Sequence, residues 1–564
     1  MKICFIWVER FRNFDNFGIN LSSSEKLRYE MGVLSRSPVN IIPYCLFGTS
    51  IVEVTGIVGK NGAGKSNALE LICHAVKGGK NSIASDFLIV TNDNDKFTCH
   101  YSFSSGLKPV IPLDFEAHEY DPAFYPSKVI FFSNVFDQRR TIFHRDISDI
   151  SLNKLAMSVP VTKRGITNFE KQIRLVNSKI FSNLEIDLPA KVQLLSRLWS
   201  TRSSFRIENS SSLHSSSAKQ FRMNFRDRIR DINVVNKFVA LFKFGFFFEF
   251  YVFYQKKQKS ENRIFSFVKN LTALFNEIEN IRSTEEIGDR LIEYLEENFS
   301  LSDLKSDRLS KIEEIEDGTI GATTFQAQVT FLKSLRRTVS SLDLEYHSEG
   351  QRAKSIEYFT FNYQSKGSRK FISDFTSLFG KMELFDLDWM GISSGHKAYI
   401  NIFASLHQEL RATRNEALLL CIDEGDLYLH PKWQVEFFDK LIQTLPNIFS
   451  GKVQLVLTSH SPFLLSDLPR QNISILAPER SGASMDGVEL LSNTFGGNLY
   501  DLYAEPFFLG NKRTSDFAHR VIRSVIEQAE SGELDQEKKN MLLSNISMFG
   551  DEIIQMRLRK ILSK

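Results

Sequence analysis

The chain has 564 residues, of which 42% are hydrophobic and 24% are charged, so it can bury a large core and is long enough for more than one structural unit. The formal net charge of +3 is small, and overall charge therefore does not indicate nucleic-acid binding. Its five cysteines are odd in number and form no C-x-x-C pair. This pattern argues against a disulfide framework or a structural zinc site, and it favours the reducing cytoplasm.

After an N-terminal strand, the sequence predicts a strand over residues 51–58 and a helix over residues 67–76, joined by a glycine-rich loop. The loop, residues 59–66, matches G-x-x-x-x-G-K-[ST]. In this pattern backbone N–H groups surround phosphates, while the lysine and the hydroxyl reach the terminal phosphate and Mg²⁺. We therefore expect ATP and Mg²⁺ as cofactors. The expected contacts come from Gly59, Asn61, Gly62, Ala63, Gly64, Lys65, Ser66 and Asn67, with Ser66 on the metal.

The middle of the chain is predicted to be mainly helical. The phenylalanine-rich run over residues 238–254 is interrupted by Lys243 and Glu249, so we expect a buried core element and no membrane span. Apolar residues at helical spacing over residues 264–278 predict one helix, and the capping box over residues 283–286 opens another.

A basic stripe lies in the same middle region. On a helix Arg222, Arg226 and Arg230 fall at i, i+4 and i+8, flanked by Phe221 and Phe225. Such a stripe is suited to nucleic-acid phosphates. The alternative is a solvated helix face with two core phenylalanines, and the sequence leaves both interpretations open.

Strands return in the last third of the chain, over residues 418–422 and 453–457, as continuous apolar runs typical of a parallel sheet. Asp423 and Glu424 follow the first run, and His460 follows the second. Ligands of open α/β folds bind at the carboxyl edge of the sheet. We expect Asp423 to hold Mg²⁺, Glu424 to orient and deprotonate the attacking water, and His460 to sense the γ-phosphate. A helix over residues 431–445 supplies the crossover between the two strands.

The phosphate loop, the segment Ser393-Ser394-Gly395, the acidic pair and the histidine together resemble the ABC-type, AAA_21-type ATPase heads of the SMC-like and OLD-like families. The resemblance implies an α/β head with a mixed sheet flanked by helices, split by a large, mainly helical insertion. It also implies a head-to-head homodimer, or a higher oligomer built from such dimers. In this dimer Ser393, Ser394 and Gly395 act on the partner's ATP. Residues 423–431 resemble the D-E-x-x-x-x-L-H-P stretch of the OLD-like branch.

One position departs from the usual family pattern, and one expected family ligand has more than one candidate in this sequence. His396 stands where Glu or Gln commonly follows the signature glycine, which favours slow hydrolysis. The glutamine-loop ligand of ATP and Mg²⁺ has three candidates, Ser133, Asn134 and Gln138, of which we favour Gln138.

Residues 131–137 and 493–509 resemble the corresponding stretches of PtuA-type ATPases of Septu and retron-associated antiphage systems. This resemblance implies an effector that is a PtuB-like HNH nuclease, restrained in retron versions by a reverse transcriptase and its branched RNA–DNA product. The implied activity is ATP-driven control of a separate nuclease.

The motifs predict four parts of the chain. Residues 1–140 and 376–510 form the two halves of the ATPase head, residues 141–375 form an arm or partner-binding insertion, and residues 511–564 form a helical tail. Two alternatives remain: an SMC-like DNA-repair ATPase that clamps DNA, and a self-sufficient OLD-like nuclease. The first needs a long coiled coil, and the second needs a nuclease site within this chain.

Overall fold

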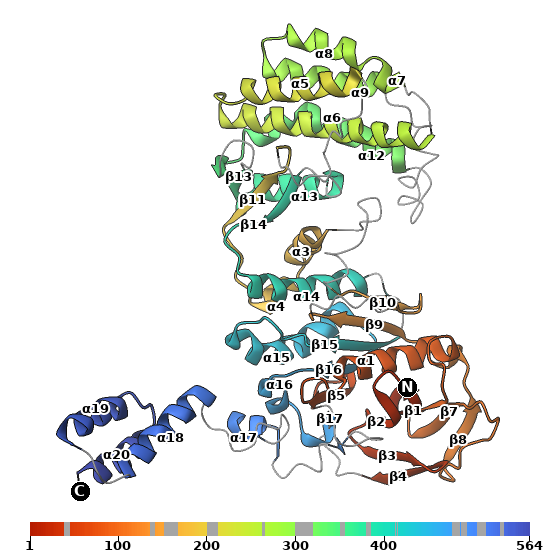
Figure 1. Cartoon of the computed structure of the whole chain (residues 1–564). Helices are drawn as coiled ribbons and strands as arrows, with labels where there is room; N and C mark the ends of the chain where they lie inside the picture. Colours follow the sequence, from red (N-terminus) through yellow and green to blue (C-terminus); the bar gives the residue numbers. More distant parts are fainter. Residues whose placement is uncertain are drawn as a thin grey trace.

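The computed structural model describes residues 1–38, 46–135, 142–151, 167–199, 213–261, 266–298, 320–349, 356–379, 385–411, 413, 416–476, 485–486, 493–504, 515–530 and 535–563. Figure 1 shows a head built from both ends of the sequence, an insertion stacked on one side of it, and a group of C-terminal helices.

A seven-stranded sheet of order β10-β9-β15-β16-β5-β17-β18 organises the head. Its strands are parallel except for β18, which is antiparallel to β17. The strands are β5 (Ile51–Gly59), β9 (Lys128–Ser133), β10 (Ile147–Asp149), β15 (Ala417–Asp423), β16 (Lys452–Thr458), β17 (Ile473–Leu476) and β18 (Met485–Asp486). The strands predicted over residues 51–58, 418–422 and 453–457 are therefore confirmed, and they are buried on both faces as a parallel sheet requires.

Helices cover both faces of this sheet (Figure 1). On one face α1 (Lys65–Cys73) packs in a core shared with a five-stranded sheet of order β2-β1-β6-β7-β8. On the other face α14 (Ser394–Leu410) and α15 (Pro431–Ile448) form a second core. The strands of the five-stranded sheet are β1 (Lys2–Phe11), β2 (Phe14–Asn20), β6 (Phe87–Asp93), β7 (Lys96–Ser102) and β8 (Phe115–Glu119), and β3 (Glu25–Glu30) pairs with β4 (Val33–Pro38) nearby. The predicted α/β head with a mixed sheet flanked by helices is confirmed.

The insertion is mainly helical, as expected, but it also contains an antiparallel sheet of order β12-β13-β11-β14. The sheet comprises β11 (Lys191–Ser196), β12 (Glu345–Glu349), β13 (Ile356–Asn362) and β14 (Phe385–Trp389). The helices are α5 (Leu213–Arg228), α6 (Val234–Glu261), α7 (Ser266–Lys269), α8 (Leu271–Glu279), α9 (Thr284–Asn298), α12 (Ile320–Val339) and α13 (Lys366–Phe379).

The phenylalanine-rich run lies in α6, at the centre of the largest apolar core. Lys243, which interrupts that run, is buried and forms an ion pair with Asp289 of α9. The buried core element is therefore confirmed. Among the residues that the structure describes, we find no helix with the length and apolar character needed to cross a membrane.

Two details of the insertion differ from the sequence expectation. The single helix over residues 264–278 is wrong, because Asn270 is non-helical and separates α7 from α8. The sheets also cross the expected boundaries: β10 pairs with β9 of the head, and β14 pairs with β11 of the insertion. One half of the predicted capping box is present, since the Glu286 backbone N–H donates to Ser283 Oγ at 3.4 Å at the start of α9.

Helices close the described part of the chain. They are α16 (Pro462–Ser466), α17 (Leu499–Ala504), α18 (Asp516–Glu530), α19 (Gln536–Ser547) and α20 (Glu552–Leu562). The last three pack around their own small apolar cluster, apart from the head (Figure 1).

A buried glutamine joins the insertion to the head. Gln172 of α3 (Asn168–Val176) accepts from Trp389 Nε1 of β14 at 2.8 Å and donates to Asn401 Oδ1 of α14 at 2.6 Å. All three side chains are less than 10% exposed, and Gln172 is fully buried. Because buried polar groups are costly without partners, this relay fixes the root of the insertion against α14.

We predict that Gln172→Leu destabilises the protein by about 2–3 kcal/mol, because it leaves the Trp389 indole N–H and the Asn401 amide buried without partners. Thermal unfolding checks the size of the effect. Gln408→Leu is the control: Gln408 accepts from Arg174 nearby but is partly exposed, and we expect a loss below about 1 kcal/mol. Equal losses in the two variants would contradict a special role for the relay.

Candidate functional site

The glycine-rich loop connects β5 to α1 at the carboxyl edge of the seven-stranded sheet. Gly62 and Gly64 have φ values of 81° and 98°, in the left-handed region that favours glycine. A Cβ on Gly64 would lie 2.6 Å from Asn13 Nδ2 and 3.0 Å from the Phe14 ring, whereas a Cβ on Gly62 would meet no atom within 4 Å. The backbone conformation therefore favours glycine at both positions, and at position 64 a side chain would also displace Asn13.

Lys65 starts α1 and folds back over the loop. Its side chain is 5% exposed, and its Nζ donates to the carbonyl oxygens of Gly59 at 3.3 Å and Lys60 at 3.5 Å. Burial lowers the pKa of Lys65, while the carboxylates of Glu424 and Asp423 act to raise it. The ammonium group thus lies inside the loop, where a phosphate would meet it together with the N-terminus of α1.

Asp423 is where distant parts of the sequence meet. Its Oδ1 accepts from Ser66 Oγ at 3.1 Å and Thr458 Oγ1 at 2.7 Å, and its Oδ2 accepts from Ser133 Oγ at 3.0 Å. The residue is 2% exposed, and burial raises the pKa of Asp423 against these hydrogen bonds. A carboxylate surrounded by hydroxyl oxygens is a donor set that suits a hard cation such as Mg²⁺, and a bound cation would favour the charged form of the acid.

Glu424 is held in an unusual conformation beside a histidine. Its φ is 49°, and its backbone N–H donates to Thr458 Oγ1 at 3.0 Å. Its Oε1 lies 3.1 Å from Nε2 of His460, which is 37% exposed, while the Glu424 side chain is 15% exposed. Left-handed backbone at a non-glycine residue is a strain that often marks functional positions. The structure thus brings Lys65, Ser66, Asp423, Glu424 and His460 to one edge of the sheet.

Two of the three glutamine-loop candidates lie among the described residues. Ser133 contacts Asp423, whereas Asn134 Nδ2 donates to the carbonyl of Leu427 at 2.8 Å. Gln138, the candidate favoured from the sequence, lies outside the described residues. Sequence reasoning gave no role to Thr458, although the parallel register places Asp423 opposite both Thr458 and Ser133. Ser133 was already a candidate from the sequence, and reading the residues that end neighbouring strands in register would also have found Thr458.

The signature segment lies on a different part of the same head. Ser393 caps α14 by accepting from the His396 backbone N–H at 3.2 Å, and Ser394 is exposed. A Cβ on Gly395 would lie 2.6 Å from the carbonyl oxygen of Tyr428. The described contacts of this segment are therefore with α14 itself and with the loop after β15, not with residues 59–66.

The basic stripe does not form one exposed helical face. Arg222 donates to the Leu198 carbonyl, and the guanidinium groups of Arg222 and Arg226 lie 5.4 and 5.3 Å from the Trp199 ring centroid. Arg226 also lies 3.7 Å from the buried carboxylate of Glu357. Arg230 falls beyond the end of α5, so the i, i+4, i+8 helix is wrong at its last position.

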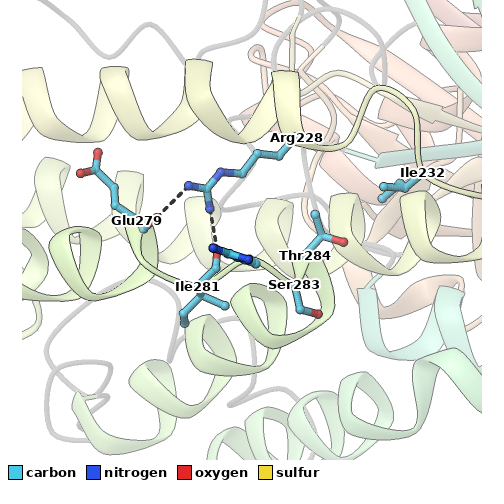
Figure 2. A pocket seen from close by; sticks show the side chains of 7 residues that line it. Arg228, Ile232, Glu279, Ile281, Ser283 and Thr284 are labelled. Carbon is cyan, nitrogen blue, oxygen red and sulfur yellow. Dashed lines mark hydrogen bonds between the residues drawn. The ribbon is translucent and has the colours of Figure 1, made fainter.

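The flanking aromatic residues follow the alternative interpretation, because Phe221 and Phe225 are buried in the core of the insertion. The neighbouring Arg228 is likewise engaged within the insertion. It donates to the carbonyls of Glu279 and Ile281, both at 2.9 Å, beside a pocket of about 490 Å³ (Figure 2). Arg222 and Arg226 thus bind the segment after β11 and β13, and Arg228 binds the end of α8 and the residues that follow it, which leaves fewer charges for a nucleic-acid surface on α5.

A glycine-rich loop between a parallel strand and a helix, facing an acidic strand end, defines a P-loop α/β head, here with a mainly helical insertion. Residues 54–466, more than half of the chain, match the family described as "AAA domain, putative AbiEii toxin, Type IV TA system". The chain belongs to this AAA_21 family.

Two curated relatives are similar to parts of the chain. "Retron Vc95 probable ATPase" from Vibrio cholerae serotype O1 biovar El Tor is 26% identical over 251 residues, covering 43% of each chain. "Retron Ec83 probable ATPase" from Escherichia coli is 27% identical over 128 residues, covering 21% of this chain and 23% of the relative. The chain thus spans less than half the length of each of these relatives.

We predict that Gly64→Ala lowers ATP affinity by at least about tenfold, because its methyl group displaces Asn13 and the left-handed backbone is strained. Gly62→Ala is the matched control, with similar φ but open space, and we expect a loss of about fivefold or less. Titration with a fluorescent ATP analogue measures both. Equal losses would show that crowding at position 64 is unimportant.

Proposed function

We propose that this chain binds ATP with Mg²⁺ and hydrolyses it. The observation that carries this proposal is the convergence of the Ser66, Ser133 and Thr458 hydroxyls on Asp423, beside Lys65 and the Glu424–His460 pair. These groups lie at the carboxyl edge of a parallel sheet, where nucleotides bind in α/β folds. Membership of an AAA family and the printed names of both relatives support the same activity.

The residues divide the chemistry between them. Residues 59–67 hold the phosphates through backbone N–H groups, and Lys65 places its positive charge beside them. Ser66 and Asp423, with Ser133 near by, supply oxygen atoms for Mg²⁺. When bound, the metal neutralises charge on the phosphate oxygens. Glu424 orients the attacking water and accepts its proton, and His460, which contacts Glu424, hydrogen-bonds near the terminal phosphate. Gln138 remains a candidate ligand of ATP and Mg²⁺.

The signature segment completes the site of a second copy in this proposal. Ser393 and Ser394 are exposed at the start of α14. Their described contacts do not involve the phosphate loop of their own chain, so a second copy can bring its signature segment to that loop. A head-to-head dimer would place Ser393, Ser394 and Gly395 over the partner's ATP. ATP then acts as a ligand of the closed dimer, because its contacts with both heads favour that state.

The biological role that we propose is antiphage defence. Both relatives carry "Retron" in their names, and the PtuA resemblance implies a separate HNH nuclease, with a reverse transcriptase and its RNA–DNA product as a restraint. The described insertion is a compact unit with one aromatic core, which favours a partner-binding arm over the long rod of a DNA clamp. The chain would therefore control a nuclease that belongs to another protein.

We predict that Glu424→Gln lowers ATP turnover by at least about 100-fold while ATP binding is retained, because the amide cannot accept the proton of water. With Mg²⁺ and ATP the variant should accumulate as a dimer, seen by light scattering. Unchanged turnover would remove Glu424 from the role of base.

The exposed signature serine provides the control for the dimer. Ser394→Arg should retain ATP binding but prevent dimerisation in the Glu424→Gln background, since the larger side chain obstructs closure. Ser340→Arg, at another exposed serine, in the insertion, should not affect the dimer. A dimer that survives Ser394→Arg would contradict the composite site.

We predict that the purified chain with Mg²⁺ and ATP does not cleave DNA, and that cleavage appears when an HNH nuclease encoded beside it is added. The assay compares plasmid and phage DNA with and without that partner. Cleavage by this chain alone, lost in Asp423→Ala, would favour the self-sufficient nuclease instead.

A further inference from the structure

Trp433 lies at the junction between the signature helix and the loop that carries Glu424. It occupies the first turn of α15, directly after that loop, and its side chain is partly exposed. The indole ring stacks on Tyr399 of α14, with centroids 5.8 Å apart and planes 4° apart. The His396 ring lies 4.9 Å away, and the His430 ring lies 6.2 Å away in an edge-on arrangement. One side chain thus contacts both elements.

The backbones of the two elements also approach closely here. A Cβ on Gly395 would lie 2.6 Å from the Tyr428 carbonyl oxygen and 3.8 Å from the Trp433 ring. The start of α14 therefore rests directly on the loop after β15, and it cannot move toward that loop without displacing Tyr428. Any shift of the signature turn is transmitted at this contact.

The loop itself is a short series of turns that begins at the proposed base. Leu427 N–H donates to the Glu424 carbonyl at 3.0 Å, and Leu429 N–H donates to the Asp426 carbonyl at 3.2 Å. Glu424 and Tyr428 both have positive φ, at 49° and 67°. Strained backbone persists only where the surroundings hold it in place. Near Glu424 the support comes from Thr458, the middle of the loop is held by Asn134 and Ser459, and Tyr428 lies against Gly395.

His396 completes the contact from the signature side. Its Nε2 is buried without a described hydrogen-bond partner, and burial lowers the pKa of His396, so the ring is neutral at pH 7. A neutral ring beside the indole packs as an aromatic surface. The backbone of Asp187 also hydrogen-bonds His396, so the ring combines that bond with an aromatic contact to Trp433.

We propose that Trp433 is a positioning residue for ATP hydrolysis: it fixes the loop over residues 424–430 against the first turn of α14 and so sets the position of Glu424. This inference rests on the proposed ATPase function. It assigns a physical link between the signature segment and Glu424, the proposed general base, of the same chain. When the signature turn binds a ligand and moves, it displaces Trp433 and Tyr428. The loop over residues 424–430 then shifts and changes the position of Glu424.

The test measures steady-state ATP hydrolysis by the full chain carrying Trp433→Ala, Trp433→Phe or Phe438→Leu. Misplacing a catalytic group by about 1 Å costs up to about 100-fold in rate, so we expect Trp433→Ala to lower kcat by about tenfold or more. KM for ATP should stay within about twofold, because the phosphate loop is untouched. Trp433→Phe retains an aromatic surface and should keep at least about a third of kcat.

Phe438→Leu controls for a general loss of stability. Phe438 lies on the same helix and is buried, and its ring packs against Phe47 with centroids 5.8 Å apart. Its kcat per folded protein should equal that of the unchanged chain. In a double-mutant cycle, His396→Ala and Trp433→Ala should lower kcat together by less than the product of their separate effects, since both break one contact.

The outcomes separate this inference from the function on which it rests. If Glu424→Gln abolishes turnover but Trp433→Ala leaves kcat unchanged, the ATPase proposal stands and the positioning role is wrong. The positioning role is also wrong if Trp433→Ala raises only KM, or if Phe438→Leu lowers kcat equally. A chain that binds no ATP and shows no turnover overturns both.

Discussion

The architecture of the head depends on the burial of one carboxylate, that of Asp423. An acid at 2% exposure is tolerated only when hydrogen bonds replace its lost hydration, and here three hydroxyl groups do so. Ser66 comes from the glycine-rich loop, Ser133 from β9 and Thr458 from β16. Each must reach the edge of the sheet in register, so the strand order and the place of α1 follow from the same constraint.

The second feature is the way in which the insertion is attached. It leaves the head between β10 and α14, and its root is held by a relay in which Gln172 bonds Trp389 and Asn401. Asn401 lies on α14, the helix that begins at the signature segment. A partner bound to the insertion would therefore act on a helix whose first turn contacts the loop of Glu424. Rigid packing along α14 provides the physical connection.

The sequence predicted three central strands of the head, β5, β15 and β16, because long apolar runs next to glycine and acidic residues leave few alternatives. It also identified the residues that gather at the sheet edge, since Lys65, Asp423 and His460 each follow or precede such a run. The sequence did not predict the role of Thr458 or the four-stranded sheet of the insertion, because both depend on which distant strands pair. The paired strands β11 and β13 are far apart in the chain, and no local pattern specifies their register.

Local charge patterns were the least reliable guide. The stripe of arginines on α5 has the spacing of a phosphate-binding face, but Arg222 and Arg226 turn inward to Trp199 and Glu357. Long arginine side chains can cover apolar surface while satisfying buried acceptors. Their spacing shows that the arginines lie on one face of the helix. It does not show whether other residues of the protein cover that face.

The pairing of β5 also constrains how the chain folds. Both of its neighbours, β16 and β17, follow the insertion in the sequence. During synthesis, β5 therefore emerges long before the strands that will flank it, and several hundred residues must follow before the sheet can close. Such distant pairing slows folding and leaves an apolar strand exposed in the meantime. A chain truncated within the insertion would keep residues 59–66 but lack β16 and β17, the two strands that flank the strand carrying the phosphate loop.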